Sequence, residues 1–107
     1  MKKRTHKTEI AQIKKLIGHM GGHVYVTHQG YGNGRTGALW GTAGIPDLFC
    51  MVRGRAFWIE VKVGRDKLRQ SQATFKELAE RHGQTVVVGD IDAVIEFLNK
   101  EDSDARP

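Results

Sequence analysis

Two central segments of the chain alternate between apolar and polar positions with the period of β-strands. Residues 45–52 and 56–63 are short, largely apolar runs, and residues 53–55 between them are a turn signal. Because successive side chains of a strand point to opposite faces, Glu60 and Lys62 share one face. The pattern therefore predicts a hairpin that carries two charged side chains on the same side.

A tight turn at residues 53–54 would fix the register of this hairpin. It places Phe49 opposite Trp58 and Asp47 opposite Glu60. Two opposed carboxylates repel each other unless a cation lies between them. A shift of one residue would send them to opposite faces, so the register is a prediction that coordinates can refute.

The segments around the hairpin have the 3.6-residue period of amphipathic helices. A first helix is predicted over residues 8–20, with Thr8 as its cap. A second helix, capped by Asp66 or Ser71, ends near residue 82. The remaining predicted elements are strands over residues 23–27 and 84–88 and a helix over residues 91–99.

These elements predict one α/β domain over residues 1–107, with a mixed sheet flanked by helices in the order α-β-β-β-α-β-α. A chain of this size buries a single modest core. Residues 1–7 form a basic arm and residues 100–107 a polar tail, and both are expected to be mobile.

A long glycine-rich segment, residues 28–44, separates the first predicted strand from the hairpin. Such a loop in a small domain is typically functional, and Tyr31 and Arg35 suit contact with a sugar-phosphate backbone. A plain flexible linker is the alternative. Residues 32–37 also spell G-x-G-x-x-G, but no helical period follows before Pro46, so a dinucleotide site is not predicted.

Composition points to an anionic partner. The net charge is +5, and nucleic acid is the commonest partner of a basic domain. A merely soluble basic protein is the alternative. Cys50, the single cysteine, fits a buried thiol in a reducing cytoplasm. No membrane span or signal peptide is apparent, and the five histidines and Cys50 lack the paired spacings of a zinc site.

Residues on the predicted helices add to the hairpin. Glu9 lies at the edge of the first apolar stripe, where a helix-start carboxylate is the alternative interpretation. Gln72 lies on the inner face of the second helix and needs a hydrogen-bond partner there, unless it is a partly exposed first-turn residue. The basic residues near this helix are Arg65, Lys67 and Arg69.

Asp47, Glu60 and Lys62 together suit phosphodiester chemistry. Mg²⁺ takes oxygen ligands and needs only one or two protein carboxylates. A lysine beside it could position the attacking water or stabilise developing charge on the phosphate. A solvated strand face with a weak salt bridge is the alternative, and Phe49 and Trp58 on the same face argue against it.

The segments 44–48 (Gly-Ile-Pro-Asp-Leu) and 58–62 (Trp-Ile-Glu-Val-Lys), with Gln72 downstream, resemble the PD-(D/E)xK nuclease superfamily. More narrowly, residues 8–99 are similar to the virus-type replication-repair nuclease (VRR-NUC) domain, in a stand-alone form like that of bacteriophages. The resemblance implies a restriction-endonuclease-like core. It also implies that the metal is held by Asp47, Glu60, the Val61 carbonyl and Glu9, with Lys62 and Gln72 completing the catalytic site.

The resemblance also implies a Mg²⁺-dependent endodeoxyribonuclease, with Mn²⁺ as a substitute and no organic cofactor. Branched DNA such as four-way junctions is the expected substrate, cut by a homodimer. Exchange of the segment around residues 28–44 between the two protomers is a separate hypothesis, and the sequence leaves it open. If the chain is phage-encoded, it acts in the bacterial cytoplasm. A non-catalytic DNA-binding module and a nicking or flap nuclease without junction preference are the alternatives.

Overall fold

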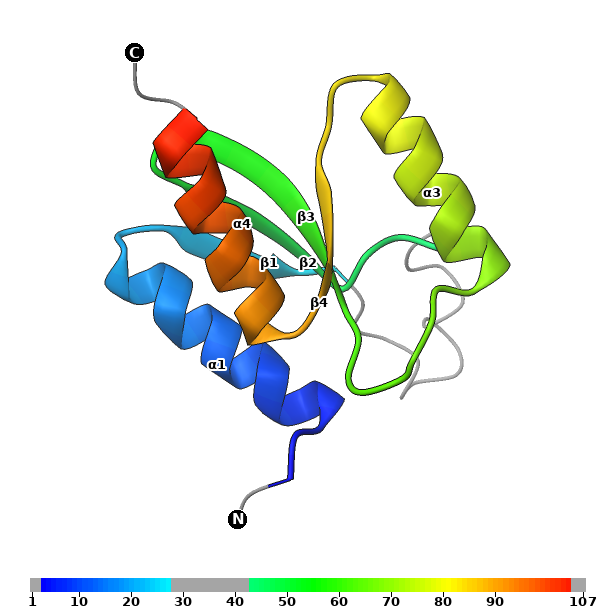
Figure 1. The fold of residues 1–107 in the computed structure, drawn as a ribbon, viewed down its shortest axis with the longest axis horizontal. Helices are drawn as coiled ribbons and strands as arrows, with labels where there is room; N and C mark the ends of the chain where they lie inside the picture. Colours follow the sequence, from blue (N-terminus) through cyan, green and yellow to red (C-terminus); the bar gives the residue numbers. More distant parts are fainter. Residues whose placement is uncertain (1–2, 28–42, 105–107) are drawn as a thin grey trace.

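The computed structural model describes the backbone of residues 3–27 and 43–104 and the side chains as far as residue 100. Its elements confirm the α/β class and the predicted order of helices and strands (Figure 1). They are α1 (His6–His19), β1 (His23–Val26), β2 (Leu48–Val52), β3 (Arg55–Val61), α3 (Gln70–Arg81), β4 (Val86–Gly89) and α4 (Ile91–Asp104).

The four strands form one mixed sheet in the order β1-β2-β3-β4. The first two pairs are antiparallel and β3 pairs with β4 in parallel, which requires the crossover that α3 supplies. In Figure 1, α1 and α4 lie side by side on one side of the sheet and α3 lies on the other. The domain therefore has three layers. Among the described residues, no helix is long and apolar enough to cross a membrane.

The core lies between the sheet and the α1–α4 pair. The inward side chains of β2 and β3 are apolar, as their alternation predicts. They pack against the apolar stripes of the two helices and exclude water from this face. The side chains that form this core include Ile13, Ile17, Leu48, Cys50, Val52, Phe57, Ile59, Val61, Val94 and Leu98.

The predicted hairpin register is confirmed. Phe49 pairs with Trp58, and their ring centroids are 4.7 Å apart on the face turned toward α3. The turn residues Arg53 and Gly54 have φ of 54° and 79°, the left-handed conformation that tight hairpin turns require. Leu48 opposite Ile59 is the pair farthest from the turn. One step beyond it, the same register would set Asp47 opposite Glu60.

The first helix begins earlier than its apolar stripe suggests. Thr5 is the N-cap: its side chain accepts from the Thr8 amide, and the Thr8 hydroxyl accepts from the Thr5 amide at 2.9 Å. Thr8 is therefore at the third helical position and is not the cap. His6 and Lys7 belong to α1, so the prediction of a mobile arm over residues 1–7 is wrong for them.

Other boundaries also differ from the predictions. The N-cap residue of α3 is Arg69, so the prediction of Asp66 or Ser71 as its cap is wrong. β2 begins at Leu48 because Pro46 has no amide hydrogen to pair. α4 continues to Asp104, because no glycine or proline ends it where its apolar stripe stops. The first part of the predicted mobile tail is therefore helical.

Candidate active site

Asp47 is held where the chain enters β2. Thr27 fixes its backbone: the Thr27 amide donates to the Asp47 carbonyl at 2.9 Å, and the Thr27 hydroxyl donates to the carbonyl of Pro46. The Asp47 carboxylate reaches across to β3, where Oδ2 accepts from the Val61 amide at 2.8 Å. The side chain is thereby turned toward the strand that carries Glu60.

Gly44 brings this segment against the start of α3. Its φ is +95°, and a Cβ at this position would lie 2.2 Å from the carbonyl oxygen of Ser71. Only glycine fits such a close approach of two backbones. The contact ties the approach to Asp47 to the first turn of α3, which carries Gln72.

Glu60 is buried, with 3% of its surface exposed. Its Oε2 accepts from Gln72 Nε2 at 3.0 Å, and Gln72 Oε1 in turn accepts from the Arg69 amide at 2.8 Å. The predicted inner-face partner of Gln72 is therefore Glu60, and the exposed alternative is wrong. The second oxygen, Glu60 Oε1, is buried without a hydrogen-bond partner in the described part of the chain.

The charges around Glu60 are unbalanced. Burial and then the Asp47 charge together raise the pKa of Glu60 to about 7, although Lys62 opposes the rise. Lys62 Nζ lies 3.6 Å from Glu60 Oε2, on a side chain that is only 14% exposed. A buried carboxylate with a raised pKa beside a second acid is a feature of functional sites. Because the pKa of Glu60 stays raised, the single Lys62 does not neutralise the Asp47 and Glu60 pair.

His6 is a neighbour of this pair that sequence reasoning missed. Its Nε2 lies 3.2 Å from Asp47 Oδ2, across 41 residues of sequence. The apolar period of α1 gives no sign of this contact, because His6 precedes the stripe. A cap at Thr5 was the available signal, since it would have placed His6 and Glu9 one turn apart on the same helix face.

Glu9 has a different partner from the one expected. It is 3% exposed, and its Oε1 accepts from the Ile91 amide at 2.8 Å, at the start of α4. Its Oε2 lies 3.8 Å from Arg4 Nε. The structure therefore places Glu9 as a cap for α4, and among the described residues it forms no three-residue metal group with Asp47 and Glu60.

The donors at the site suit a hard cation with few protein ligands. The carboxylates of Asp47 and Glu60 offer oxygens, and the unpartnered Glu60 Oε1 needs a positive partner. Two carboxylates are what Mg²⁺ commonly takes, with water and substrate phosphate for the rest. Residues 3–27 and 43–100 contain no group of three or more His, Cys, Asp or Glu arranged to hold a metal. The pair would therefore act without Glu9.

A zinc site of cysteine and histidine finds no support in the described residues. Cys50 is fully buried in the core, and burial raises the pKa of its thiol to about 12. A protonated thiol is a poor metal ligand. Cys50 is a packing residue, as its apolar surroundings predict.

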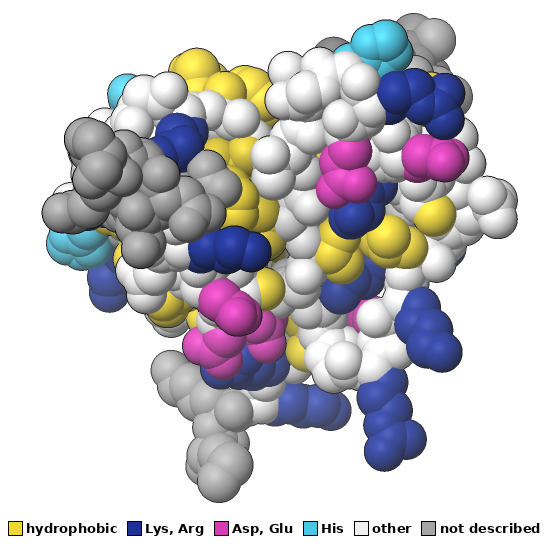
Figure 2. All heavy atoms as spheres, turned by 45° about the horizontal axis from the view of Figure 1, so that its top comes forward, with side chains coloured by type: hydrophobic (Ala, Val, Ile, Leu, Met, Phe, Trp, Pro, Cys, Tyr) yellow, Lys and Arg dark blue, Asp and Glu magenta, His cyan; other side chains and the backbone are white. Residues whose placement is uncertain are grey.

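The expected DNA contacts are only partly described. Arg65, Lys67 and Arg69 are exposed on the segment between β3 and α3, beside Lys62 and Gln72 in sequence. Tyr31 and Arg35 lie outside the described residues. On the face that Figure 2 shows, lysine and arginine side chains are spread out with acidic side chains between them.

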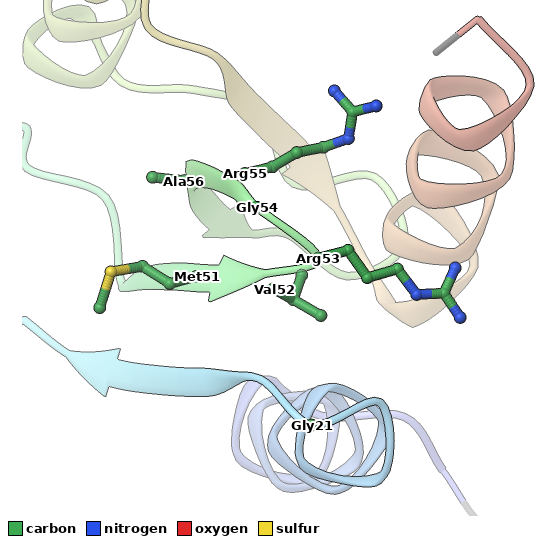
Figure 3. A pocket seen from close by; sticks show the side chains of 7 residues that line it. All are labelled: Gly21, Met51, Val52, Arg53, Gly54, Arg55 and Ala56. Atoms are coloured by element: carbon green, nitrogen blue, oxygen red, sulfur yellow. The ribbon is translucent and has the colours of Figure 1, made fainter. Parts of the chain in front are cut away.

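A hollow of about 330 Å³ lies at the opposite end of the hairpin, between the β2–β3 turn and Gly21 (Figure 3). Figure 3 shows the side chains of Arg53 and Arg55 pointing apart at its edge. The five residues of β2 span about 17 Å at roughly 3.4 Å per residue, and the hollow lies at the end of β2 away from Asp47. It contains no carboxylate and is not the site described above.

Comparison with known proteins gives one informative result. A solved structure described as a VRR_NUC domain superposes with a TM-score of 0.64 at 25% identity, and the match covers 87% of this chain and 97% of that chain. No family model matches the chain, and no similar curated sequence was found.

The mixed sheet, its flanking helices, the acid that precedes β2 and the acid on β3 are consistent with a nuclease-type fold of the PD-(D/E)xK kind. More narrowly, the structural match supports a VRR-NUC domain, and the resemblance predicted from the sequence is confirmed.

Proposed function

We propose that the domain is a metal-dependent endodeoxyribonuclease that cuts branched DNA, such as four-way junctions, as a homodimer. The similar structure is a nuclease-family domain, which makes DNA the substrate class. The proposed metal is Mg²⁺, with Mn²⁺ as a substitute. The proposed ligands are Asp47, Glu60 and the Val61 carbonyl.

One observation carries this proposal: a buried carboxylate oxygen, Glu60 Oε1, has no partner in the described part of the chain and belongs to a residue that faces a second acid. Such an arrangement costs free energy, and Lys62 offsets only part of the rise in the Glu60 pKa. A divalent cation would remove both the repulsion and the missing contact. A domain that only binds DNA gains nothing from this pair.

The residues of the chain have separate roles in the proposed reaction. Gln72 fixes Glu60 Oε2, which leaves Oε1 for the cation. Lys62 positions the attacking water and stabilises negative charge that develops on the phosphate. A bound divalent ion supplies Lewis-acid polarisation of the phosphate and a lower pKa for its water.

DNA binding is proposed through the exposed basic residues Arg65, Lys67 and Arg69, which would contact backbone phosphates. A net charge of +5 favours such a substrate. A two-fold dimer would present two sites to the two strands of a symmetric junction. Light scattering that shows only monomer, with and without junction DNA, would contradict the dimer.

Cleavage of a panel of DNA structures tests the proposal. Single-stranded, duplex, flap, forked and four-way junction DNA are incubated with Mg²⁺, Mn²⁺ or EDTA. We expect junction cutting that requires a divalent ion, and we expect Lys62→Ala to lower the rate about 10²- to 10⁴-fold. Lys76→Ala is the matched control, because Lys76 is a lysine in an exposed ion pair with Glu80 on α3.

Three results would change the conclusion. Salt-sensitive binding without cleavage under any metal would favour a DNA-binding module. Equal cleavage of flaps, forks and junctions would remove the junction preference and keep the nuclease. Full activity of Lys62→Ala would exclude the proposed role of that lysine.

A further inference from the structure

The first turn of α1 contacts the proposed metal site through a residue for which no role has been given. His6 is the first residue of α1, and its Nε2 lies 3.2 Å from Asp47 Oδ2. The imidazole is about half exposed, so burial alone does not hold it there. Its place is instead fixed by the helix start.

Two sets of contacts hold this helix start. Thr5 and Thr8 exchange the capping hydrogen bonds that begin α1. Arg4, two residues before His6, pairs with Asp90 at 2.5 Å and Asp92 at 3.0 Å. The backbone of His6 is therefore fixed from both sides, and its side chain is presented to Asp47 in a defined position.

Among the described residues, the hydrogen bonds given to the Asp47 side chain by the Val61 amide and His6 fall on one of its two oxygens. Oδ2 accepts from the Val61 amide at 2.8 Å and also faces His6 Nε2. A neutral imidazole with its hydrogen on Nε2 can donate to this oxygen. Two donors on Oδ2 fix the plane of the carboxylate and direct Oδ1 as the oxygen for a cation.

We infer that His6 is a positioning residue that orients the Asp47 carboxylate toward a bound divalent cation. The inference rests on the metal site proposed above. Outer-shell partners of this kind hold ligating carboxylates in place and raise metal affinity. His6 is not inferred to be a ligand, because the ring nitrogen that faces the site is engaged with Asp47 and the described residues hold no three-donor metal group.

Mn²⁺ binding tests the inference without relying on cleavage. Free Mn²⁺ is measured by electron paramagnetic resonance during titration of the full chain, and thermal unfolding is followed in parallel. We expect His6→Ala to weaken Mn²⁺ binding about 10- to 100-fold. His6→Gln retains a donor at the position of Nε2, and we expect it to restore most of the affinity.

His19→Ala is the matched control, since His19 is an exposed histidine in the last turn of the same helix. It should bind Mn²⁺ like the wild type. If His6→Ala does not fold, the comparison of His6→Gln with His6→Leu decides the question, because only the first can donate to Asp47.

The outcomes separate this inference from the proposed function. Absence of Mn²⁺ binding by the folded wild type overturns the metal site itself. Wild-type binding with equal affinity in His6→Ala overturns only the role of His6. Nitrogen coupling to the bound Mn²⁺ in the wild type, lost in His6→Ala, would make His6 a direct ligand and would also overturn the positioning role.

Discussion

The first turn of α1 contacts two groups of acidic side chains, and the two groups differ in how completely their carboxylates are paired within the protein. One group lies around Arg4 at the start of α4. It consists of Asp90, Asp92 and Glu9, and Glu9 is its member on α1. The other is the pair of Asp47 and Glu60, which α1 reaches through His6. Both contain carboxylates close together, so a count of acids does not distinguish them.

Each acid around Arg4 has an ion-pair or hydrogen-bond partner within the protein. Arg4 pairs with Asp90 and Asp92, and the buried Glu9 accepts from the Ile91 amide. A carboxylate at the start of a helix is also favoured by the helix dipole. These contacts account for the acids structurally, without an external partner.

In the pair of Asp47 and Glu60, one carboxylate oxygen lacks such a partner among the described residues. Lys62 is the nearby cation, at 3.6 Å from Glu60 Oε2, while Glu60 Oε1 has no partner in the described part of the chain. The pKa of Glu60 is raised first by burial and then by the Asp47 charge, and Lys62 does not cancel the rise. The comparison shows that the acids proposed to bind the metal include a buried oxygen without a partner in the described residues, whereas the acids around Arg4 are paired.

The largest contrast is expected in cleavage. Asp47→Asn and Glu60→Gln each remove a proposed metal ligand, and we expect each to lower the cleavage rate more than about 100-fold. Glu9→Gln changes an acid of the other group, and we expect its rate to stay within about tenfold of the wild type. Rates are measured under single-turnover conditions with Mg²⁺. A Glu9→Gln variant as inactive as Glu60→Gln would break the distinction between the two groups.

The next effect is a gain in stability. Glu60 has a folded-state pKa of about 7, above the ordinary 4.5, so the folded protein keeps a proton that the unfolded chain loses. Without divalent metal, the free energy of unfolding should therefore fall as pH rises from about 4.5 to about 7. Glu60→Gln removes this fall and should be more stable than the wild type by on the order of 1–3 kcal/mol above pH 7.

Thermal unfolding in EDTA at several pH values measures this gain. The stability difference between Glu60→Gln and the wild type should be lost below about pH 4.5, where the wild-type carboxyl is protonated. Added Mn²⁺ should stabilise the wild type and leave Glu60→Gln unchanged. Glu77→Gln, an exposed acid on α3, is the control. A Glu60→Gln variant less stable than the wild type at neutral pH would show that the pair is compensated.

The hairpin and its acids could be predicted because the information is local. The period of two fixes which side chains share a face, and the turn at Arg53 and Gly54 fixes the register. Asp47, Glu60 and Lys62 follow from these two facts. Gln72 could be assigned to the inner face of its helix, although its partner could not be identified.

The first turn of α1 could not be predicted in the same way. Thr5 and Thr8 both fit a helix cap, and the long-range contact of Arg4 with Asp90 just before the helix is not visible in a local pattern. The contact of Glu9 with Ile91 joins residues 82 positions apart, and no local pattern encodes it. Helix and strand ends differ for the same reason, since a boundary depends on neighbours as well as on the apolar stripe.

A smaller effect is expected when Glu9, the acid of the Arg4 group that caps α4, is removed. Glu9→Ala leaves the Ile91 amide without its buried acceptor, and we expect a loss of about 0.5–2 kcal/mol in the free energy of unfolding. Glu9→Gln keeps an acceptor oxygen and should lose less. Urea denaturation measures both, with Glu96→Ala as the exposed control on α4. An equal loss for Glu9→Ala and Glu96→Ala would mean that the cap contributes no stability.

The smallest effect is expected at Arg4, whose side chain is 46% exposed. Exposed ion pairs contribute little to stability, so Arg4→Ala should lower the free energy of unfolding less than Glu9→Ala does. The loss should shrink at high salt, because screening already weakens the pairs with Asp90 and Asp92. Urea denaturation at low and high salt tests it, with Lys14→Ala as an exposed control on α1. A large loss that salt does not reduce would mean that Arg4 holds the start of α1 by packing, and that the two acidic groups are joined more tightly than their charges require.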